Sequence, residues 1–297
     1  MQENYLKKCL SQKAEYVNLS LKKFLPKDNS VISQAMRYSV MAGGKRLRPI
    51  FVFLSAELFG SKDSDVVPAA CAVEFIHTYS LIHDDLPAMD NDDLRRGMPA
   101  NHKKFGEAAA ILCGDALLTE AFSLITKSNS DDKNINEAVK ILAHYSGYKG
   151  MIAGQSEDTL ETGKWSGESK NILEKKLKFI QTQKTSALIV ASLKIGAVLA
   201  GAGAEALKAL AVYGTNLGIA FQIKDDILDV YADKTVLGKK GSDSANDKLT
   251  ALSLFGKEKA DNMTDVYIKK AKKALSVFGN KAETLFGLAD YMAVRNY

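Results

Sequence analysis

The stretch from Ala204 to Tyr231 decides the fold, and it reads AEALKALAVYGTNLGIAFQIKDDILDVY. It contains no proline, and apolar residues such as Leu210, Leu217 and Phe221 recur in it at helical spacing. This spacing predicts one long helix over residues 204–231 with an apolar stripe. Three aspartates lie in its last two turns, so the same helix is also expected to carry chemistry.

The rest of the chain favours the same fold class. All five prolines fall in the first hundred residues, so long uninterrupted helices are expected beyond them. We find no sustained period-2 alternation bounded by hairpin turn residues, so β structure should be minor. We therefore predict an all-α fold, a single large bundle in one domain over residues 1–297. The expected helices are 3–24, 30–42, 47–60, 65–86, 105–127, 133–158, 170–184, 186–200, 204–231, 249–254, 257–278 and 281–294.

The polar segment over 232–247 is longer than a usual connection. At about 16 residues it exceeds typical loop lengths, which predicts a lid or binding loop.

Composition narrows the class of protein. Apolar residues make up 46% of the 297 residues, enough for a sizeable core. The chain has no run of about 18 apolar residues and no apolar signal segment near Met1, so we expect a cytoplasmic protein without stable membrane insertion. Cys9, Cys71 and Cys113 form no C-x-x-C pair, so neither a disulfide framework nor a zinc site is indicated. A net charge of +5 with dispersed lysines suits small anionic ligands better than nucleic acid.

A dense acidic cluster follows an apolar run, and over residues 82–97 it reads IHDDLPAMDNDDLRRG. Asp84 and Asp85 lie where the preceding helix should end. Carboxylates there oppose the negative end of the helix dipole, at a cost of about 0.3–1 kcal/mol each. A bound cation would offset that cost, and aspartate oxygens are the ligands that Mg²⁺ prefers. The arginines that follow suit phosphate groups. For the charge run alone, a solvated acidic loop is the alternative.

A second acidic cluster lies near the end of the 204–231 helix. Asp225 and Asp229 are four residues apart, so they share one face, and Gln222 shares it too. Like charges at this spacing destabilise a helix and again favour a bound cation. In the first cluster, Asp84 and Asp90 are six residues apart, and a regular helix would not place them on one face. We expect Pro87 to interrupt the helix in a loop that curls Asp90 back toward Asp84.

The two acidic clusters resemble the aspartate-rich motifs of the trans-isoprenyl diphosphate synthase family, in its bacterial farnesyl diphosphate synthase form. Asp84-Asp85-x4-Asp90, followed by Arg95-Arg96-Gly97, resembles the first motif with its two-residue insertion. Asp225-Asp226-x2-Asp229 resembles the second. The resemblance runs from about residue 36 to the C-terminus and rests on several further motifs in the family's order. These are Gly43-Gly44-Lys45-Arg46-Leu47-Arg48-Pro49, Gly114-Asp115-Ala116-Leu117-Leu118, Gly154-Gln155-x2-Asp158, Lys184-Thr185 and a basic tail with Arg295.

The resemblance implies a bundle of about 10–13 helices around a central cavity, several Mg²⁺ ions and a homodimer. It places the magnesium ligands at Asp84, Asp85 and Asp90 on one wall and at Asp225, Asp226 and Asp229 on the other. It assigns a homoallylic diphosphate to Lys45, Arg48, His77 and Arg96. It assigns the reacting allylic diphosphate to Arg95, Lys184, Thr185, Gln222, Lys239 and Lys248. The pattern around Lys248 follows the family only loosely.

The implied reaction joins isopentenyl diphosphate head-to-tail to dimethylallyl or geranyl diphosphate. Metal-assisted loss of pyrophosphate leaves an allylic cation, which the double bond of isopentenyl diphosphate attacks, and loss of a proton completes the product. No side chain acts as a nucleophile. The cavity should be apolar and dry, because water would capture the cation.

Product length should depend on the residues that close the cavity floor. Tyr79 and Ser80 lie five and four residues before Asp84, about one turn further from the metals. In related bacterial enzymes an aromatic residue at the position of Tyr79 goes with the fifteen-carbon product, and a small or flexible one goes with twenty carbons. We therefore predict farnesyl diphosphate, with geranylgeranyl diphosphate as the alternative.

Three other readings stay open at the level of sequence. A terpene cyclase would also ionise a prenyl diphosphate, but it should lack the homoallylic site. An all-α phosphohydrolase could use the pair His83-Asp84, but it would need further histidine ligands. A noncatalytic helical scaffold would not need two complete acidic motifs. For His77 taken without the family resemblance, a core histidine bonded to a backbone carbonyl is the favoured interpretation.

Overall fold

The computed structural model of the chain describes residues 2–231 and 248–294. These residues divide into two compact units. The N-terminal unit comprises Lys7–Leu142 and Lys194–Ala202, and the C-terminal unit comprises Met1–Leu6, Ala143–Leu193 and Gly203–Tyr297. The single domain over 1–297 stays a prediction.

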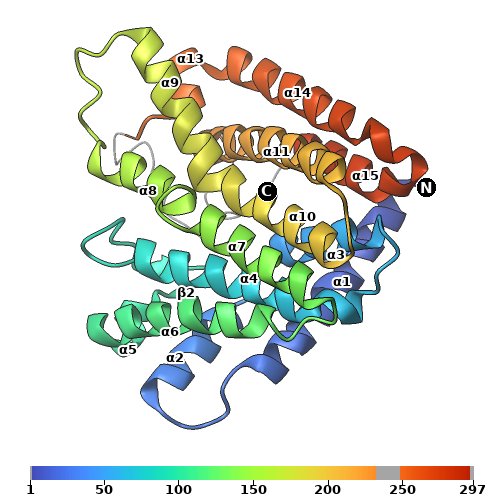
Figure 1. Cartoon of the computed structure of the whole chain (residues 1–297). Coiled ribbons are helices and arrows are strands. Elements are labelled where there is room, and N and C mark those ends of the chain that lie inside the picture. Colours follow the sequence, from blue (N-terminus) through green and yellow to red (C-terminus); the bar gives the residue numbers. More distant parts are fainter. Residues whose placement is uncertain (1, 232–247, 295–297) are drawn as a thin grey trace. The chain divides into compact units, whose positions relative to one another are not determined.

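Helix α4 (Asp63–Asp84) is the central element of the N-terminal unit. It packs against α2 (Val31–Val40), α3 (Leu47–Glu57) and α6 (Glu107–Ile125), and Figure 1 shows α4 and α6 side by side. Most of its residues are apolar and buried on every side, as expected for a helix without a polar face. The other elements named in this unit are α1 (Gln2–Phe24), β1 (Leu94–Arg95), β2 (Met98–Pro99), α5 (Asn101–Phe105) and α7 (Asp132–Ser146), of which α1 and α7 extend into the other unit.

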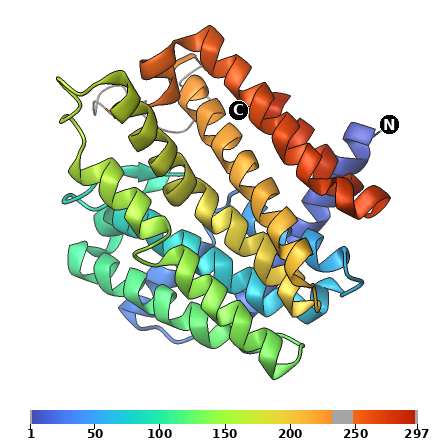
Figure 2. The ribbon, with the colours of Figure 1, turned by 45° about the horizontal axis from the view of Figure 1, so that its top comes forward.

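Helix α11 (Ala204–Tyr231) is the central element of the C-terminal unit. It runs beside α14 (Lys257–Ala274), as Figure 2 shows, and also contacts α15 (Glu283–Val294). The buried Tyr213 hydroxyl donates to the Leu285 carbonyl at 2.9 Å, which ties α11 to α15. The remaining elements are α8 (Met151–Leu160), α9 (Lys170–Ile180), the π-helical turn η1 (Gln181–Ser186), α10 (Ala187–Leu199), α13 (Ala251–Phe255) and the 3₁₀ segment η2 (Leu275–Ala282), of which α10 extends into the N-terminal unit.

The all-α prediction is confirmed. Over 2–231 and 248–294 the β structure is one hairpin, in which Leu94 pairs with Pro99 and Arg95 with Met98. The long helix predicted over 204–231 forms with those bounds. Helix α5 was not predicted, because it is only five residues long and begins two residues after Pro99.

One helix predicted over 133–158 is wrong, since the chain forms α7 and α8 with a break between them. Gly147 and Gly150 lie in this break. A Cβ atom at Gly150 would lie 2.1 Å from the Tyr145 carbonyl oxygen, and one at Gly147 would lie 2.6 Å from that of Ala143. The chain therefore turns back on the end of α7 in a way that only glycine permits.

The helix predicted over 170–184 also ends early, at Ile180, and continues as the π-helical turn η1. The Ser186 hydroxyl donates to the Gln181 carbonyl at 2.9 Å. Two glycines of neighbouring helices make room for this wider turn, because a Cβ at Gly154 would lie 2.1 Å from the Lys184 nitrogen and one at Gly218 2.6 Å from the Ser186 Cα. Single π-helical turns inside helices occur frequently at functional sites.

Two described helices, α4 and α6, are long and apolar enough to cross a membrane by length and composition. The apolar window of α4 is 78% buried in the protein, as in a core helix, and that of α6 is 39% buried. One or two such helices are weak grounds for a membrane span.

Candidate active site

The first acidic cluster begins where α4 ends, and its loop curls as the sequence predicts. The Asp90 amide donates to the Asp84 carbonyl at 2.8 Å, and the Asn91 amide donates to the Leu86 carbonyl at 3.1 Å. Asn91 has a φ of 52°, a left-handed conformation that asparagine tolerates well. The prediction that Asp90 returns to Asp84 past Pro87 is therefore confirmed for the backbone.

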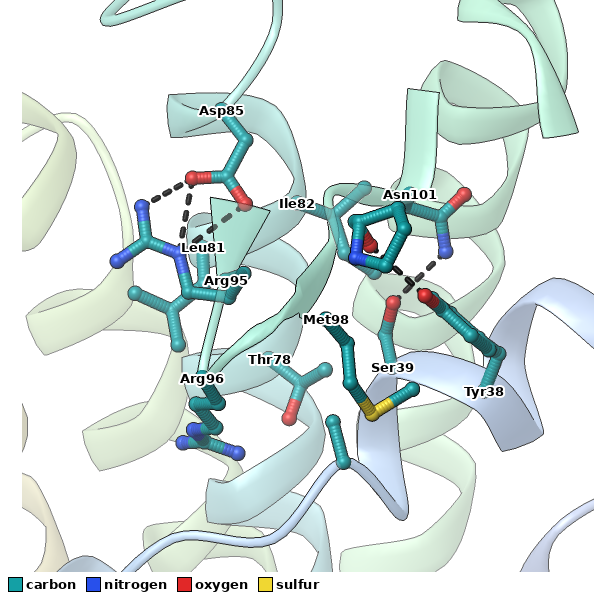
Figure 3. Close-up of a pocket in the computed structure, with 12 residues that line it drawn as sticks. Tyr38, Ser39, Thr78, Leu81, Ile82, Asp85, Arg95, Arg96, Met98 and Asn101 are labelled. Atoms are coloured by element: carbon teal, nitrogen blue, oxygen red, sulfur yellow. Dashed lines mark hydrogen bonds and ion pairs between the residues drawn. The ribbon is translucent and has the colours of Figure 1, made fainter. Parts of the chain in front are cut away.

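Asp85 is held by an arginine of the hairpin. The Arg95 Nε donates to its two carboxylate oxygens at 2.9 and 3.1 Å, and an Arg95 terminal nitrogen completes a forked contact, as Figure 3 shows. Asp85 is only 2% exposed. Burial by itself lowers the pKa of Arg95, but the carboxylate of Asp85 raises it on balance. Asp85 was predicted as a magnesium ligand, and this structure engages it in an ion pair with Arg95.

Arg96 points away from its neighbour Arg95 (Figure 3). It has a φ of 54° in the hairpin turn, and its guanidinium donates to the Gly43 carbonyl. The guanidinium lies so close to Gly44 that a Cβ there would be 2.8 Å from the Arg96 Cζ. Burial lowers the pKa of Arg96. The two consecutive arginines therefore bind different groups: Arg95 pairs with Asp85, and Arg96 contacts the loop that carries Lys45.

Arg46 holds the loop that carries Lys45 in place through its buried side chain. Its backbone is left-handed (φ 52°, ψ 31°), and its side chain is buried. The guanidinium donates to the Glu74 carboxylate at 2.5 Å, to the Val40 carbonyl at 2.6 Å and to the Asn18 side-chain oxygen at 2.9 Å. A buried arginine with all these partners orients the loop, while Lys45 next to it is exposed. Sequence reasoning missed Arg46 and Glu74, although a lone acid between Val73 and Phe75 is a recognisable sign of a buried charge pair.

His77 faces Arg48 on the neighbouring helix. Arg48 donates to the His77 Nε2 at 3.1 Å, so this nitrogen accepts and the imidazole is neutral. Burial and the nearby guanidinium groups, with Arg48 first among them, hold the pKa of His77 well below its ordinary 6.5. Of the predicted homoallylic set, the structure brings Arg48 and His77 into contact. The side chain of Arg96 contacts the glycine loop that precedes Lys45.

A small cavity adjoins these arginines, between α2, α4 and the hairpin (Figure 3). Thr78 Oγ1 and Asn101 Oδ1 are buried and have no hydrogen-bond partner within the described residues. The Asn101 amide nitrogen, in contrast, donates to the Ser39 hydroxyl at 2.7 Å. Such unsatisfied oxygens are suited to a donor supplied by water or a ligand.

The second acidic cluster contains a hydrogen-bonded chain across three elements. The Thr185 hydroxyl donates to the Gln222 side-chain oxygen at 2.6 Å, and the Gln222 amide donates to Asp226 at 2.9 Å. The other oxygen of Asp226 accepts from the Ala251 amide at 3.3 Å. Asp226 is 5% exposed, so its carboxylate joins η1, α11 and α13 rather than facing solvent. Asp225 and Asp229 of the same helix are only partly buried.

Asp158 gathers two of the predicted diphosphate-binding lysines. Its carboxylate accepts from Lys184 at 2.5 Å and lies 3.9 Å from the Lys248 ammonium. Asp158 belongs to the motif Gly154-Gln155-x2-Asp158, but the sequence pattern alone assigns it no role. The residues around it form a polar pocket with Gln181, Gln222 and Thr250. Lys239, which the resemblance assigns to the allylic diphosphate, and Arg295 of the basic tail lie outside the described residues.

Each acidic cluster by itself fits a magnesium site of the kind completed by a substrate. Asp84, Asp90, Asp225 and Asp229 are partly buried carboxylates, the hard oxygen donors that Mg²⁺ takes. Asp85 and Asp226 are engaged by protein donors. Among the residues that the structure describes, no group of three or more His, Cys, Asp or Glu side chains is placed to hold a metal by itself. Substrate phosphates commonly supply the remaining ligands to Mg²⁺.

Tyr79, the predicted floor residue, is buried on α4. It is 5% exposed, and burial, with a smaller effect of Asp84, raises its pKa to about 12. Ser80 beside it is partly buried, and its hydroxyl donates to the His77 carbonyl at 3.0 Å. Tyr79 therefore presents an un-ionised aromatic ring, whereas the Ser80 hydroxyl is used by its own helix.

Comparison with known proteins agrees with this arrangement. Residues 29–282 match the family described as polyprenyl synthetase. The chain is 43% identical over 270 residues to the farnesyl diphosphate synthase of Bacillus subtilis (strain 168), covering 90% of this chain and 89% of that protein. It is 44% identical over 292 residues to the chloroplastic geranylgeranyl pyrophosphate synthase of Capsicum annuum, covering 97% and 78% respectively.

A solved structure shares the fold. The crystal structure of an FPP/GFPP synthase from Zymomonas mobilis aligns with a TM-score of 0.87 at 35% identity, covering 98% of this chain and 100% of that one. The family match includes both acidic clusters and the basic residues around them. The chain therefore belongs to the polyprenyl synthetase family of prenyltransferases.

Proposed function

We propose that this prenyltransferase is a farnesyl diphosphate synthase, which extends dimethylallyl and geranyl diphosphate with isopentenyl diphosphate and stops at fifteen carbons. The observation that carries the length assignment is Tyr79. Its ring is buried on α4, five residues before Asp84, where a growing chain that starts at the acidic cluster would meet it.

The basic residues around each acidic cluster support binding of two diphosphates. Lys45, Arg48 and Arg96 would hold the homoallylic diphosphate, with neutral His77 bonded to Arg48. Lys184 and Thr185, on the π-helical turn, would hold the allylic diphosphate together with Gln222 and Arg95. Cationic groups around the leaving group stabilise the charge that develops there.

Magnesium would supply further stabilisation of that charge. The family uses a divalent metal for diphosphate binding, and Asp84, Asp90, Asp225 and Asp229 are the residues that would hold it here. Lys184 and Lys248 lie at Asp158 in this structure, so a bound diphosphate would compete with that carboxylate for both lysines.

Relatives of similar identity make different products, so twenty carbons is the competing outcome. The Bacillus protein is named for farnesyl diphosphate and the Capsicum protein for geranylgeranyl diphosphate. The phosphohydrolase alternative has little support, since the family match is to a synthetase and His83 Nε2 contacts the Ile111 carbonyl at 3.0 Å. A terpene cyclase would leave the Lys45, Arg48 and Arg96 set without a use.

The test is to incubate the purified protein with Mg²⁺, isopentenyl diphosphate and either dimethylallyl or geranyl diphosphate, and then to size the dephosphorylated products. Fifteen-carbon farnesol as the main product is expected. Predominant twenty-carbon alcohol would reject the length assignment. Cyclic products without use of isopentenyl diphosphate would support a cyclase instead.

We also propose a homodimer that works in the cytoplasm. Helix α6 supports a protein contact, because it is apolar, 39% buried and exposes Ile111 and Leu112 at 45% and 55%. Light scattering coupled to size exclusion should give twice the mass of the 32.3 kDa chain. A monomeric mass would reject the dimer, and recovery of the protein only with detergent would reject the cytoplasmic assignment.

A further inference from the structure

Three residues of the N-terminal unit form a connected set around the proposed floor. Tyr79 and His83 are four residues apart on α4, so their side chains share one face of the helix. Their ring centroids are 5.8 Å apart at an interplanar angle of 78°, an edge-to-face contact. The third residue, Gly114, belongs to α6, which packs along α4.

His83 contacts α6 in two ways: its ring forms a hydrogen bond to that helix, and it occupies the space that a side chain at position 114 would fill. Its Nε2 donates to the Ile111 carbonyl at 3.0 Å, because a carbonyl can only accept. A Cβ at Gly114 would lie 2.0 Å from Nε2 and 2.5 Å from Cδ2 of the imidazole. Any other residue at 114 would therefore displace the ring.

A glycine in the middle of a helix needs a packing reason. Gly114 lies inside the 19-residue helix α6, where glycine is less favourable than alanine. It is not in a left-handed conformation, so its backbone does not require glycine. The imidazole of His83 is the group that fills the space a side chain would take.

Tyr79 depends on such packing for its position. Its hydroxyl is buried and has no hydrogen-bond partner in the part of the chain that the structure describes. No polar contact to that hydroxyl therefore fixes the ring. The edge-to-face contact with His83, itself anchored on α6, limits where the ring can lie.

We propose that His83, seated over Gly114, is a positioning residue that holds Tyr79 as the chain-length floor. The choice between fifteen- and twenty-carbon prenyl diphosphates then depends on contact between α4 and α6 as well as on the residue at position 79. This inference rests on the proposed function, in which Tyr79 limits product length.

The experiment compares product length, which a general loss of stability would not change. H83A removes the ring and should raise the ratio of twenty- to fifteen-carbon product at least fivefold. H83F keeps an aromatic edge against Tyr79 and should leave fifteen carbons predominant. G114A displaces the imidazole and should change the ratio in the same direction as H83A.

The double variant H83A/G114A separates this coupling from two independent effects. With no ring at 83, the added methyl group displaces nothing, so the double variant should give the product ratio of H83A alone. G203A is the matched control, because a Cβ there meets no atom within 4 Å, and it should keep the wild-type ratio.

Fifteen-carbon product from H83A in the wild-type proportion would overturn the inference, whatever the rate. If G114A does not fold, the pair H83A and H83F still decides, because equal product ratios in both would also overturn it. Failure of the proposed function looks different, since the wild-type protein would then make no elongated product or would not stop at fifteen carbons.

Discussion

The two acidic clusters each contain one buried aspartate beside partly buried ones, but the protein holds the buried residue differently in each. Asp85 of the first cluster forms a forked ion pair with Arg95. Asp226 of the second accepts hydrogen bonds from two neutral donors, the Gln222 amide and the Ala251 backbone. The lysine near the second cluster, Lys184, has its own carboxylate in Asp158.

This difference shows that a repeated sequence motif does not imply a repeated arrangement. In the first cluster the buried Asp85 contacts Arg95, a proposed diphosphate-binding residue, directly. In the second cluster Lys184 pairs with Asp158, and Asp226 accepts from Gln222 and Ala251. Four variants or pairs of variants test this distinction, beginning with the largest expected effect.

The partly buried aspartates should dominate catalysis in both clusters. D84A and D225A should each lower kcat about 10³-fold, or about 4 kcal/mol of transition-state stabilisation, since each removes a proposed metal ligand. Steady-state kinetics would measure this, with circular dichroism to verify folding. D265A, at an exposed position of α14, is the control and should retain full activity. Wild-type turnover in D84A or D225A would exclude that residue as a ligand.

Substitution of the buried aspartates should lower the free energy of unfolding, and by more at Asp85 than at Asp226. D85N removes the forked partner of the mostly buried Arg95, which keeps only the Asp92 carboxylate at 3.1 Å, and should lower the free energy of unfolding by about 2 kcal/mol. D226N keeps one of the two accepted hydrogen bonds and turns an amide N–H toward the donor of the other, so about 1 kcal/mol is expected. Urea unfolding would measure both. Equal losses would mean that the ionic and neutral arrangements do not differ in the way described.

The two lysines at Asp158 should also differ. K184M should lower kcat/KM for the allylic diphosphate about 30-fold, or about 2 kcal/mol, because Lys184 is held at 2.5 Å from Asp158 on η1. Lys248 lies at 3.9 Å, so K248M should cost about threefold or less. The KM for isopentenyl diphosphate should change little in either variant. A larger effect of K248M would reverse the assignment of the two lysines.

His77 should make the first cluster's unit sensitive to acid. Its folded pKa is well below 6.5, so the unfolded chain takes up a proton that the folded chain does not as the pH falls through about 6.5. Stability should therefore fall with pH in this range, by at most about 1.4 kcal/mol per pH unit from this residue. H77Q should remove that part of the slope between pH 7 and 5, and H144Q, at an exposed histidine, should not. Identical slopes for wild type and H77Q would contradict the neutral His77.

Much of the fold could be predicted because it depends on local features. The absence of proline predicts the 204–231 helix, and the six-residue spacing around Pro87 predicts the return of Asp90 to Asp84. The break at Gly147 and Gly150 was missed, although two glycines within four residues are a visible sign. The turn η1 was missed for a different reason. It requires Gly154 and Gly218, which are distant in sequence and act only once the helices pack.

The same limit applies to the site. Residue type and spacing identify the aspartates but do not distinguish Asp84 from its neighbour Asp85. That distinction depends on which of the two carboxylates at the end of α4 contacts Arg95 of the hairpin, and in the structure it is Asp85. Arg46 likewise reads as one more basic residue in a motif, and only packing shows that it points inward to Glu74.

The π-helical turn η1 determines how this enzyme tolerates the deletion of a residue from its polypeptide chain. A π-helical turn holds one residue more than the α-helical turn it replaces, so deleting one residue between Gln181 and Ser186 could restore a continuous α-helix. That deletion would rotate every later side chain of α10 by about 100° relative to α9. Every residue of α10 except Lys194 is buried, so this rotation would disrupt the packing on all sides of the helix. A one-residue deletion should therefore be far more harmful here than in the exposed loop around Gly163 and Gly167, although both segments are the same few residues long.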